Sequence, residues 1–372
     1  MDSSFELTMV GLVSVLSEIT IKGSNYSYVV NSNFNFTNLS KGRLIKIIDK
    51  SVSMQASLLN LGDDLSIYLD AIEKQKDLNT VGQVLEQLSD LGANKEDCLI
   101  VIGGGVMQDI ATMAASLYMR GLNWVYVPTT LMSMIDSCIG GKSSINLNNF
   151  KNRLGNFYPP KQVVIDIEFL KTLSKLDIAS GLAEGMKICY AYSSNDALKF
   201  QTLVKKWQDT QKGEFIRQAI FLSLNRKKHF IEIDEFDKKE RKILNFGHSF
   251  GHALEASTNF TLPHGIAVLI GMQAAIIHSG NKEPCKTLSI WIKDQATEIT
   301  TLLKKFELSK SRFTEAIKID KKNSSLELNL ILPNSAGNLE LVQSSLSDSN
   351  LNICFESIVA SLEQLGFAYE VF

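Results

Sequence analysis

Residues 98–119 carry the pattern that most constrains the fold, an apolar run followed at once by glycines and a helical pattern. Residues 98–102 are all apolar, Gly103, Gly104 and Gly105 come next, and a helical pattern extends over 106–119. A strand this apolar is covered on both faces, which is typical of a parallel sheet whose strands alternate with helices. The pattern therefore predicts a parallel α/β sheet.

The rest of the chain divides into a part with alternating β-rich and helical patterns and a part with mainly helical patterns. Short β-rich runs lie at residues 26–30, 44–48, 124–127 and 163–165, with helical patterns such as 81–91 between them. Beyond about residue 170 the β-rich runs almost vanish, and helical patterns dominate at 178–192, 215–231, 249–257, 266–278 and 293–306. A chain of 372 residues is long enough for two cores. We predict an α/β N-terminal domain with a parallel sheet over residues 1–170 and a mainly α-helical C-terminal domain over residues 171–372.

Charge and composition exclude several classes of partner. The chain has 38 basic and 40 acidic residues, a net charge of −2, which leaves no basic footprint for nucleic acid. The longest uncharged apolar run, 265–277, is shorter than the ~20 residues that cross a membrane. Five scattered cysteines without a C-x-x-C pair, and an N-terminus without a basic leader, favour a reducing, cytoplasmic setting.

Two glycine turns are candidate anion sites. The glycines at 103–105 let a ligand approach the backbone where a helix begins, and a dinucleotide pyrophosphate would suit that position. The alternative is an ordinary tight turn, because the spacing is not G-x-G-x-x-G. In the second turn Lys142 follows Gly140 and Gly141, and Lys151 and Arg153 lie close in sequence. Several cations in one short segment favour phosphate over a solvated loop.

Histidines form the third candidate site. The chain has only five, and three of them are His248, His252 and His264. Residues four apart share one face of a helix, and a catalytic zinc site takes three protein ligands with one open position. Any two of these histidines with the carboxylate of Glu184, which lies in an apolar helical pattern, would suffice. His229 and His278 are interpreted as surface or helix-end residues.

Together these segments resemble the 3-dehydroquinate synthase family of sugar-phosphate cyclases, most densely over residues 73–272. The matching segments are 103–106 with Asp109, 118–121, 127–130, 136–142, 151–152, 181–184 with Lys187, 244–255, 264–265 and 320–322. The resemblance implies an α/β nucleotide-binding domain followed by a mainly helical domain that binds metal and substrate.

The resemblance also implies roles for individual residues. It implies Glu184, His248 and His264 as ligands of zinc or cobalt, so that His252 binds substrate instead. Phosphate would be bound by Lys142, Asn152, Asn245, His252 and Lys321, and Arg120 would be lent across a homodimer interface. Lys227 and Arg241 would hold the substrate carboxylate, with Asp136 and Lys187 at the reacting hydroxyls. The NAD contacts implied are Asp49, Glu73, Lys76, Gly104, Gly105, Asp109, Thr129, Thr130, Asp136, Lys142 and Lys151.

The activity implied is ring closure of a phosphorylated seven-carbon keto sugar acid, 3-deoxy-D-arabino-heptulosonate 7-phosphate, to 3-dehydroquinate. NAD would take a hydride and later return it, phosphate would leave by β-elimination, and an intramolecular aldol step would close the ring. Net chemistry would be that of a carbon–oxygen lyase acting on phosphates, in the shikimate route to aromatic amino acids.

Departures from the family pattern leave two alternatives open. Phe150, Ile266, residues 111–113 and Asp237 replace residues usual in the family, and residues 152–155 with Pro159 and Pro160 resemble cyclases of sedoheptulose 7-phosphate. The first alternative is therefore a cyclase that makes another carbasugar, for a surface glycan or a secondary metabolite. The second is a metal- and NAD-dependent polyol dehydrogenase, which would accumulate NADH.

Overall fold

The structure is a computed structural model that describes residues 18–32, 40–59, 61, 65–148, 150–319 and 327–372. It divides into two compact units. Unit 1 comprises Met1–Thr129, Ser137–Lys171 and Leu203–Lys228, and unit 2 comprises Thr130–Asp136, Thr172–Thr202 and His229–Phe372. Each unit is described by itself below.

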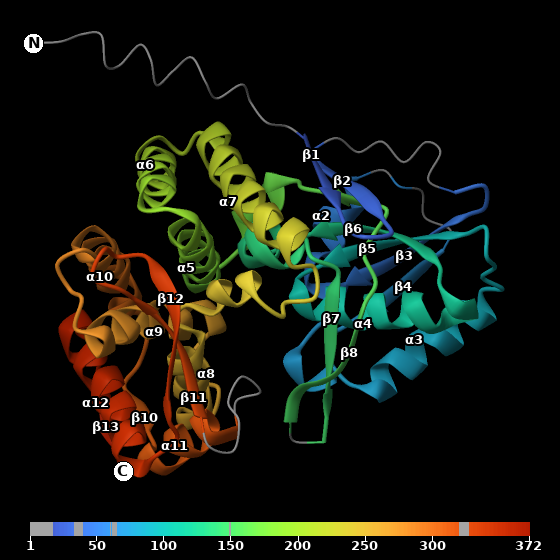
Figure 1. The fold of residues 1–372 in the computed structure, drawn as a ribbon. Helices are drawn as coiled ribbons and strands as arrows, with labels where there is room; N and C mark the ends of the chain where they lie inside the picture. The colour runs from blue at the N-terminus through green and yellow to red at the C-terminus, as the bar shows by residue number, and fades with distance from the viewer. Residues whose placement is uncertain (1–17, 33–39, 60, 62–64, 149, 320–326) are drawn as a thin grey trace, which may run out of the picture. The chain divides into compact units, whose positions relative to one another are not determined.

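Unit 1 is built on a seven-stranded sheet in the order β1-β2-β9-β6-β5-β3-β4 (Figure 1). The β1–β2 pair is antiparallel and every other neighbouring pair is parallel. All six residues of β5 are buried, as a central strand covered on both faces requires. The strands are β1 Glu18–Lys22, β2 Ser27–Asn31, β3 Leu44–Asp49, β4 Ser66–Leu69, β5 Cys98–Gly103, β6 Asn123–Pro128 and β9 Gln162–Val164.

Helix α4, Gly105–Leu117, begins directly after β5 and packs against β5, β6 and β3, with α3, Leu78–Asp90, beside it. The predicted strand–glycine–helix motif is therefore confirmed. An antiparallel hairpin of β7, Lys142–Leu147, and β8, Phe150–Phe157, packs against α4. The short helices of this unit are η1 Lys50–Val52, α2 Ser53–Ser57, η2 Glu73–Gln75, η3 Tyr118–Arg120 and η5 Ile167–Thr172.

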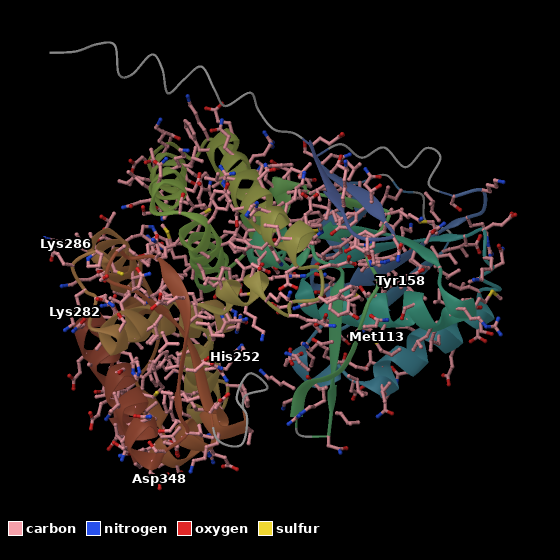
Figure 2. The ribbon with its side chains drawn as sticks, in the orientation of Figure 1. Met113, Tyr158, His252, Lys282, Lys286 and Asp348 are labelled. Atoms are coloured by element: carbon pink, nitrogen blue, oxygen red, sulfur yellow. The ribbon has the colours of Figure 1, made fainter. Side chains whose placement is uncertain are left out.

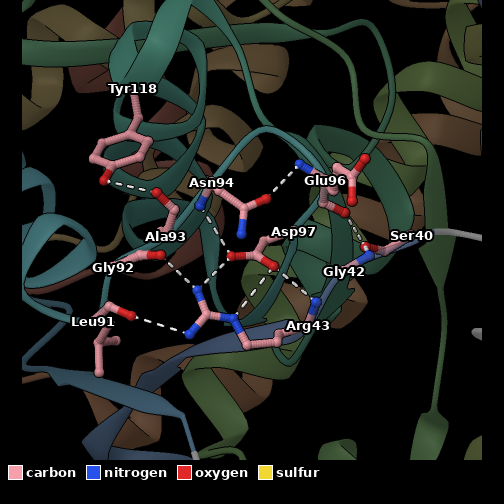
Figure 3. A network of polar contacts seen from close by, with 10 residues as sticks. All are labelled: Ser40, Gly42, Arg43, Leu91, Gly92, Ala93, Asn94, Glu96, Asp97 and Tyr118. Carbon is pink, nitrogen blue, oxygen red and sulfur yellow. Dashed lines mark hydrogen bonds and ion pairs between the residues drawn. The ribbon is translucent and has the colours of Figure 1, made fainter.

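The buried carboxylate of Asp97, just before β5, binds Arg43, just before β3, and so links the amino-terminal ends of these two strands (Figure 3). Asp97 is fully buried; it accepts from the Arg43 backbone N–H at 2.8 Å and from the Asn94 N–H at 3.0 Å. The Arg43 guanidinium lies 2.7 Å from Asp97 Oδ2 and also donates to the carbonyls of Leu91 and Gly92, just beyond α3. Burial raises the pKa of Asp97, but the hydrogen bonds from Arg43 and Asn94 outweigh it and lower the pKa overall.

Unit 2 is organised around helix α9, His264–Ser279, which is buried continuously over residues 265–276. Helices α5, α8, α10 and α12 all contact α9. The long helices from α5 onward are α5 Lys175–Tyr192, α6 Ser194–Thr210, α7 Gly213–Ile233, α8 His248–Ser257, α10 Lys286–Leu302, α11 Lys310–Ile319 and α12 Asp348–Leu365. Residues of α6 and α7 are divided between the two units. Two further short helices of unit 2 are η4, a π-helix at Ser133–Ser137, and η6, Glu240–Asn245.

Within the described residues, the predicted mainly helical region also contains strands that the sequence pattern did not indicate. Strands β11, Glu327–Pro333, and β12, Leu339–Ser345, form an antiparallel hairpin, and β10, Phe306–Leu308, pairs in parallel with β13, Tyr369–Val371. β10 and β13 have three residues each and β12 is mostly exposed, so these three strands lack the long apolar run that made β5 recognisable. All five cysteines are buried and form no disulfide, as predicted for small core residues. None of the helices in the described part of the chain combines the length and the apolar character that a bilayer crossing requires.

Candidate metal centre and active site

Three helices of unit 2 bring Glu184, His248 and His264 together. Glu184 lies in α5, and the two histidines are the first residues of α8 and α9. Glu184 Oε1 is 3.3 Å from His264 Nε2 and 3.8 Å from His248 Nε2. In a tetrahedral zinc site with bonds of about 2.0–2.1 Å, neighbouring donor atoms stand roughly 3.3 Å apart. The spacing of the three donors is therefore close to what one divalent ion requires.

Glycines set this spacing by letting the helices approach closely. A Cβ on Gly265 would overlap the backbone carbonyl of Ser180 in α5, and one on Gly271 would overlap the carbonyl of Gly247. Gly247 itself has φ 75°, a left-handed conformation that glycine adopts without strain, and it directly precedes α8. The close packing of the α5, α8 and α9 backbones thus sets the Cα positions of Glu184, His248 and His264.

Hydrogen bonds orient the two imidazoles. His248 Nδ1 lies 3.3 Å from the carbonyl oxygen of Phe246, which can only accept, so Nδ1 carries the proton. His264 Nδ1 lies 3.1 Å from Oε2 of Glu255, which accepts in the same way. In both rings the other nitrogen, Nε2, is left to face Glu184. Such partners on the far side of the ring are typical of metal-bound histidines.

Glu184 is the electrostatic centre of the cluster. Its side chain is 1% exposed, and Lys187 Nζ, 4% exposed, lies 2.5 Å from Oε2. Neither carboxylate oxygen accepts a well-aligned hydrogen bond from the residues that the structure describes. Burial raises the pKa of Glu184, but the Lys187 ammonium and the two imidazoles outweigh it and hold the pKa well below its usual range. The carboxylate is therefore ionised and able to take a cation, so the donor set fits a divalent metal.

The two histidines differ in charge when no metal is bound. Burial lowers the pKa of His248 well below its usual range, and the neighbouring Lys187 adds to this effect. Burial also lowers the pKa of His264, but the adjacent carboxylates of Glu184 and Glu255 outweigh burial and raise the pKa to about 10. A metal entering the site would therefore displace a proton from His264.

His252 lies at the edge of the same cluster and is exposed (Figure 2). The candidate donor atoms of His248, His252 and His264 all lie within 4.8 Å of one another. The ring of His252 stacks on that of His264 with 5.5 Å between centroids. The structure thus gathers all three clustered histidines, and it places two of them with Nε2 toward Glu184.

The remaining candidates of unit 2 lie on separate segments. Arg241 in η6 is 4% exposed, and its guanidinium donates to the Glu235 carbonyl at 2.6 Å. Asn245, at the end of η6, donates to the Lys242 carbonyl. Two further candidates, Asp136 in η4 and Thr130 just before it, are half-buried, and Thr130 Oγ1 is 2.8 Å from Ser133 Oγ. Lys321 lies outside the described residues.

In unit 1, the predicted NAD contacts follow the carboxyl ends of parallel strands. Asp49 ends β3, the segment with Glu73 and Lys76 follows β4, Gly104 and Gly105 follow β5, and Thr129 follows β6. Because these strands run in parallel, their carboxyl ends share one edge of the sheet, where open α/β sheets bind ligands. Gly104 is the N-cap of α4 and offers no side-chain cap, so backbone N–H groups are available there.

A buried lysine connects several of these residues. Lys76 Nζ, in a side chain 8% exposed, lies 3.1 Å from Asp109 Oδ2 and donates to Asn152 Oδ1 at 2.7 Å. The Asp109 carboxylate also accepts from the Ser144 backbone N–H, and Asn146 donates to Glu73 Oε1. Burial raises the pKa of Asp109, although Lys76 opposes the shift. The structure therefore places Asn152, predicted as a phosphate ligand, against the predicted NAD residues.

Four cations of unit 1 complete the candidate set. Lys142 begins β7 and is exposed, Lys151 in β8 is half-buried, and Lys227 in α7 is 8% exposed. Arg120 ends η3 on the surface with φ 64°, next to Met119 with φ 47°. Two consecutive non-glycine residues in left-handed conformations are uncommon, so the surrounding structure must hold this turn in its conformation.

Comparison with known proteins identifies the family. The 3-dehydroquinate synthase N-terminal family matches residues 66–180, and the 3-dehydroquinate synthase C-terminal family matches residues 181–323. A 3-dehydroquinate synthase of Campylobacter concisus is 36% identical over 289 residues, which cover 76% of this chain and 80% of that protein. The chain belongs to the 3-dehydroquinate synthase family. It is an enzyme of the lyase class, as the sequence motifs predicted.

Solved structures support the fold of a 3-dehydroquinate synthase family member. A 2-deoxy-scyllo-inosose synthase complexed with carbaglucose-6-phosphate, NAD⁺ and Co²⁺ superposes with a TM-score of 0.74 at 21% identity, covering 92% of this chain and 99% of that one. The 2-epi-5-epi-valiolone synthase of Streptomyces hygroscopicus subsp. jinggangensis, with NAD⁺ and Zn²⁺, gives 0.74 at 24% identity, with 92% and 98% covered. The predicted fold class, a mainly parallel sheet with a helical C-terminal region, is confirmed.

Sequence reasoning missed three residues that contact the candidates. Ser144 and Asn146 lie in β7 beside Asp109 and Glu73, and polar residues of this kind in a strand give no signal by themselves. Glu255 could have been found. Like Glu184 it is an acidic residue among apolar neighbours in a helical pattern, and it falls on the same helix as two of the clustered histidines.

Proposed function

We propose that this enzyme closes 3-deoxy-D-arabino-heptulosonate 7-phosphate into 3-dehydroquinate and releases phosphate. The observation that carries the proposal is the convergence of Glu184, His248 and His264 on one point within a chain of this family. An ionised, buried carboxylate and two imidazoles whose Nε2 atoms face it are the donors that a catalytic zinc or cobalt site uses.

The proposal assigns NAD to residues 1–170 and metal and substrate to residues 171–372. When bound, the metal would acidify a substrate hydroxyl and NAD would accept a hydride and return it, so that no net oxidation occurs. Two solved relatives hold NAD⁺ with Co²⁺ or Zn²⁺, which supports the same pair here. The residues proposed for NAD are Asp49, Glu73, Lys76, Gly104, Gly105, Asp109, Thr129, Thr130, Asp136, Lys142 and Lys151.

The protein's own residues would bind and orient the substrate. Lys187 lies beside Glu184 with its ammonium buried, where it can donate a proton to, or stabilise, an oxygen on the reacting carbons. Asp136 is proposed at the same hydroxyls. The phosphate is proposed to meet Lys142, Asn152, Asn245, His252 and Lys321. Holding a flexible seven-carbon chain in one geometry removes much of the entropic barrier to intramolecular ring closure.

Charge favours a carboxylated substrate. Lys227 and Arg241, the two residues that the family resemblance assigns to a substrate carboxylate, are both present and are 8% and 4% exposed. A keto sugar acid offers a carboxylate as well as a phosphate, whereas sedoheptulose 7-phosphate offers only the phosphate. We therefore assign Lys227 and Arg241 to the substrate carboxylate and favour the shikimate reaction over another carbasugar.

The proposal is tested by supplying the purified enzyme with NAD and Zn²⁺ or Co²⁺. Phosphate release and the cyclic product would be measured with 3-deoxy-D-arabino-heptulosonate 7-phosphate and, separately, with sedoheptulose 7-phosphate. We expect one phosphate per ring formed and no accumulation of NADH. Turnover of sedoheptulose 7-phosphate alone would indicate another carbasugar, and stoichiometric NADH with a polyol would indicate a dehydrogenase.

Variants connect the activity to the proposed centre. Glu184→Ala and His264→Ala should each lose bound metal and turnover, since two ligands remain. His229→Ala is a matched control, because His229 is exposed and its ring packs against those of Tyr192 and Phe230, outside the proposed ligand set. Full activity of either centre variant with metal still bound would refute the ligand assignment.

We also propose that the enzyme acts as a homodimer in which Arg120 reaches the substrate phosphate of the partner subunit. Arg120 is exposed at a turn of unusual backbone conformation. Light scattering would give the oligomeric state. Mixing inactive Arg120→Ala chains with inactive His264→Ala chains should restore part of the activity if the arginine acts in the other subunit. Failure of complementation in a demonstrated mixed dimer would contradict this assignment.

A further inference from the structure

We propose that Glu255 is a positioning residue that holds His264 in the orientation and tautomer needed to bind the metal. This inference rests on the proposed function, because it takes His264 as a metal ligand. The observation behind it is a single contact: Oε2 of Glu255 lies 3.1 Å from Nδ1 of His264, on the side of the ring opposite Glu184.

Glu255 is placed for this purpose by helix α8. It lies seven residues after His248, about two helical turns along, so both residues share one face of the helix. Its side chain is 9% exposed, and a buried carboxylate is unfavourable unless it is paired. The backbone carbonyl of Glu255 accepts from the Phe260 N–H at 2.7 Å, a bond that any substitution at this position would retain. The side chain can therefore be changed without removing the local turn.

The two proposed imidazole ligands are held in different ways. His248 depends on the Phe246 carbonyl, which every residue at position 246 would supply. The orientation of His264 depends instead on the side chain of Glu255, and the His264 side chain is itself 34% exposed. His264 is therefore the ligand whose geometry a single substitution can disturb.

Physical chemistry gives the carboxylate two effects on its partner. As an acceptor it keeps the ring proton on Nδ1, which leaves the Nε2 lone pair for the metal. As an anion it increases the electron donation of the ring to the metal. Loss of such a partner weakens metal binding by about 10- to 100-fold in known sites. Glutamine would keep an acceptor of the same size without the charge, and alanine would remove both.

The experiment compares wild-type enzyme with Glu255→Gln and Glu255→Ala. Ser257→Ala is the matched control, since Ser257 is buried on the same helix and its hydroxyl donates only to the Leu254 carbonyl. Affinity would be measured by titrating Co²⁺ against a chelator and following the visible absorption of bound cobalt. We expect about a 10- to 100-fold loss for alanine, a smaller loss for glutamine and none for the control.

A second readout separates positioning from a general structural role. In the cobalt-loaded enzyme, each ligating histidine with a protonated Nδ1 gives its own shifted, solvent-exchangeable N–H resonance in the proton spectrum. The wild type should show two. Glu255→Ala should lose one of them to fast exchange and keep the other, because the contact of His248 with the Phe246 carbonyl is untouched. If the alanine variant folds poorly, the glutamine variant supplies the affinity comparison.

Cobalt affinity unchanged in both variants, with both N–H resonances retained, would overturn this inference while leaving the proposed function intact. A wild type that binds cobalt with two such resonances but converts neither sugar phosphate would refute the proposed function and not the role of Glu255. A wild type that binds no cobalt would overturn both.

Discussion

Replacing Glu184 by glutamine tests the buried charge pair at the centre of unit 2. The change keeps the size of the side chain and removes its charge, so Lys187 is left as a buried cation without its carboxylate. The side chains of Glu184 and Lys187 are 1% and 4% exposed, and the two charged groups are 2.5 Å apart. Water can therefore neither screen the pair nor replace the missing partner.

The magnitude follows from that burial. Removing one partner of a buried ion pair costs roughly 3–5 kcal/mol, whereas replacing both by apolar residues of similar volume is often neutral. We expect metal-free Glu184→Gln to lose about this amount, and we expect Glu184→Gln combined with Lys187→Met to recover most of it. The double variant should still bind no metal, so stability and metal binding are separated.

Urea unfolding of the metal-free proteins, followed by circular dichroism, gives the three free energies of unfolding. Added Zn²⁺ at 100 times its dissociation constant should stabilise the wild type by about 2.7 kcal/mol through preferential binding to the folded state. It should stabilise neither variant. A Glu184→Gln protein whose free energy of unfolding is within about 1 kcal/mol of the wild-type value would refute the argument, since an unpaired buried ammonium should destabilise the fold by more than that. So would a double variant no more stable than the single one.

Two further predictions concern packing and pH. Gly265→Ala should reduce the stability of unit 2 by roughly 1–3 kcal/mol and weaken metal binding, because its Cβ would push α9 away from Ser180. The control is Gly82→Ala in α3, where a Cβ meets nothing within 4 Å, and this change should be neutral or stabilising. Equal effects in a thermal unfolding assay would contradict the close-packing argument. The pKa of Asp97 is lowered in the folded state, so its contribution to stability is present above the ordinary pKa of about 3.9. That contribution is lost as pH falls through the lower pKa of the folded state. Asp97→Asn should therefore be less stable than wild type at neutral pH, and its free energy of unfolding should fall less on acidification. An acid-unfolding curve identical to that of wild type would show that the network around Asp97 does not stabilise the fold.

The sequence by itself determined the sheet and predicted where a nucleotide would bind to it. A fully apolar strand such as β5 can only lie inside a sheet, and the glycines after it mark where a helix begins close to a ligand. Once the strands are parallel, Asp49, Gly104 and Thr129 must lie at the same edge, because each directly follows a strand. Glu184 was detectable for a similar reason, as an acidic residue in the apolar middle of a helix.

Local patterns could not show the short strands after residue 170 or the contacts of Asn152. Strands β12 and β13 are half-exposed or exposed, so they carry no run of buried residues. Asn152 and Lys76 are 76 positions apart, and their contact depends on how the β7–β8 hairpin packs beside α4. No periodicity within either segment contains that information.

Spacing along the chain left the clustered histidines equivalent; the family resemblance implied how they differ, and the tertiary structure supplies the physical reason. In sequence, His248, His252 and His264 are equivalent donors, and the spacing of four favours the first two as a pair. The glycine contacts that bring α5, α8 and α9 together place Nε2 of His248 and His264 toward Glu184 and leave His252 exposed. The reason is physical: a metal site is defined by donor atoms a few ångströms apart, and those distances are set by helix packing between residues up to 80 positions apart, not by their spacing along the chain.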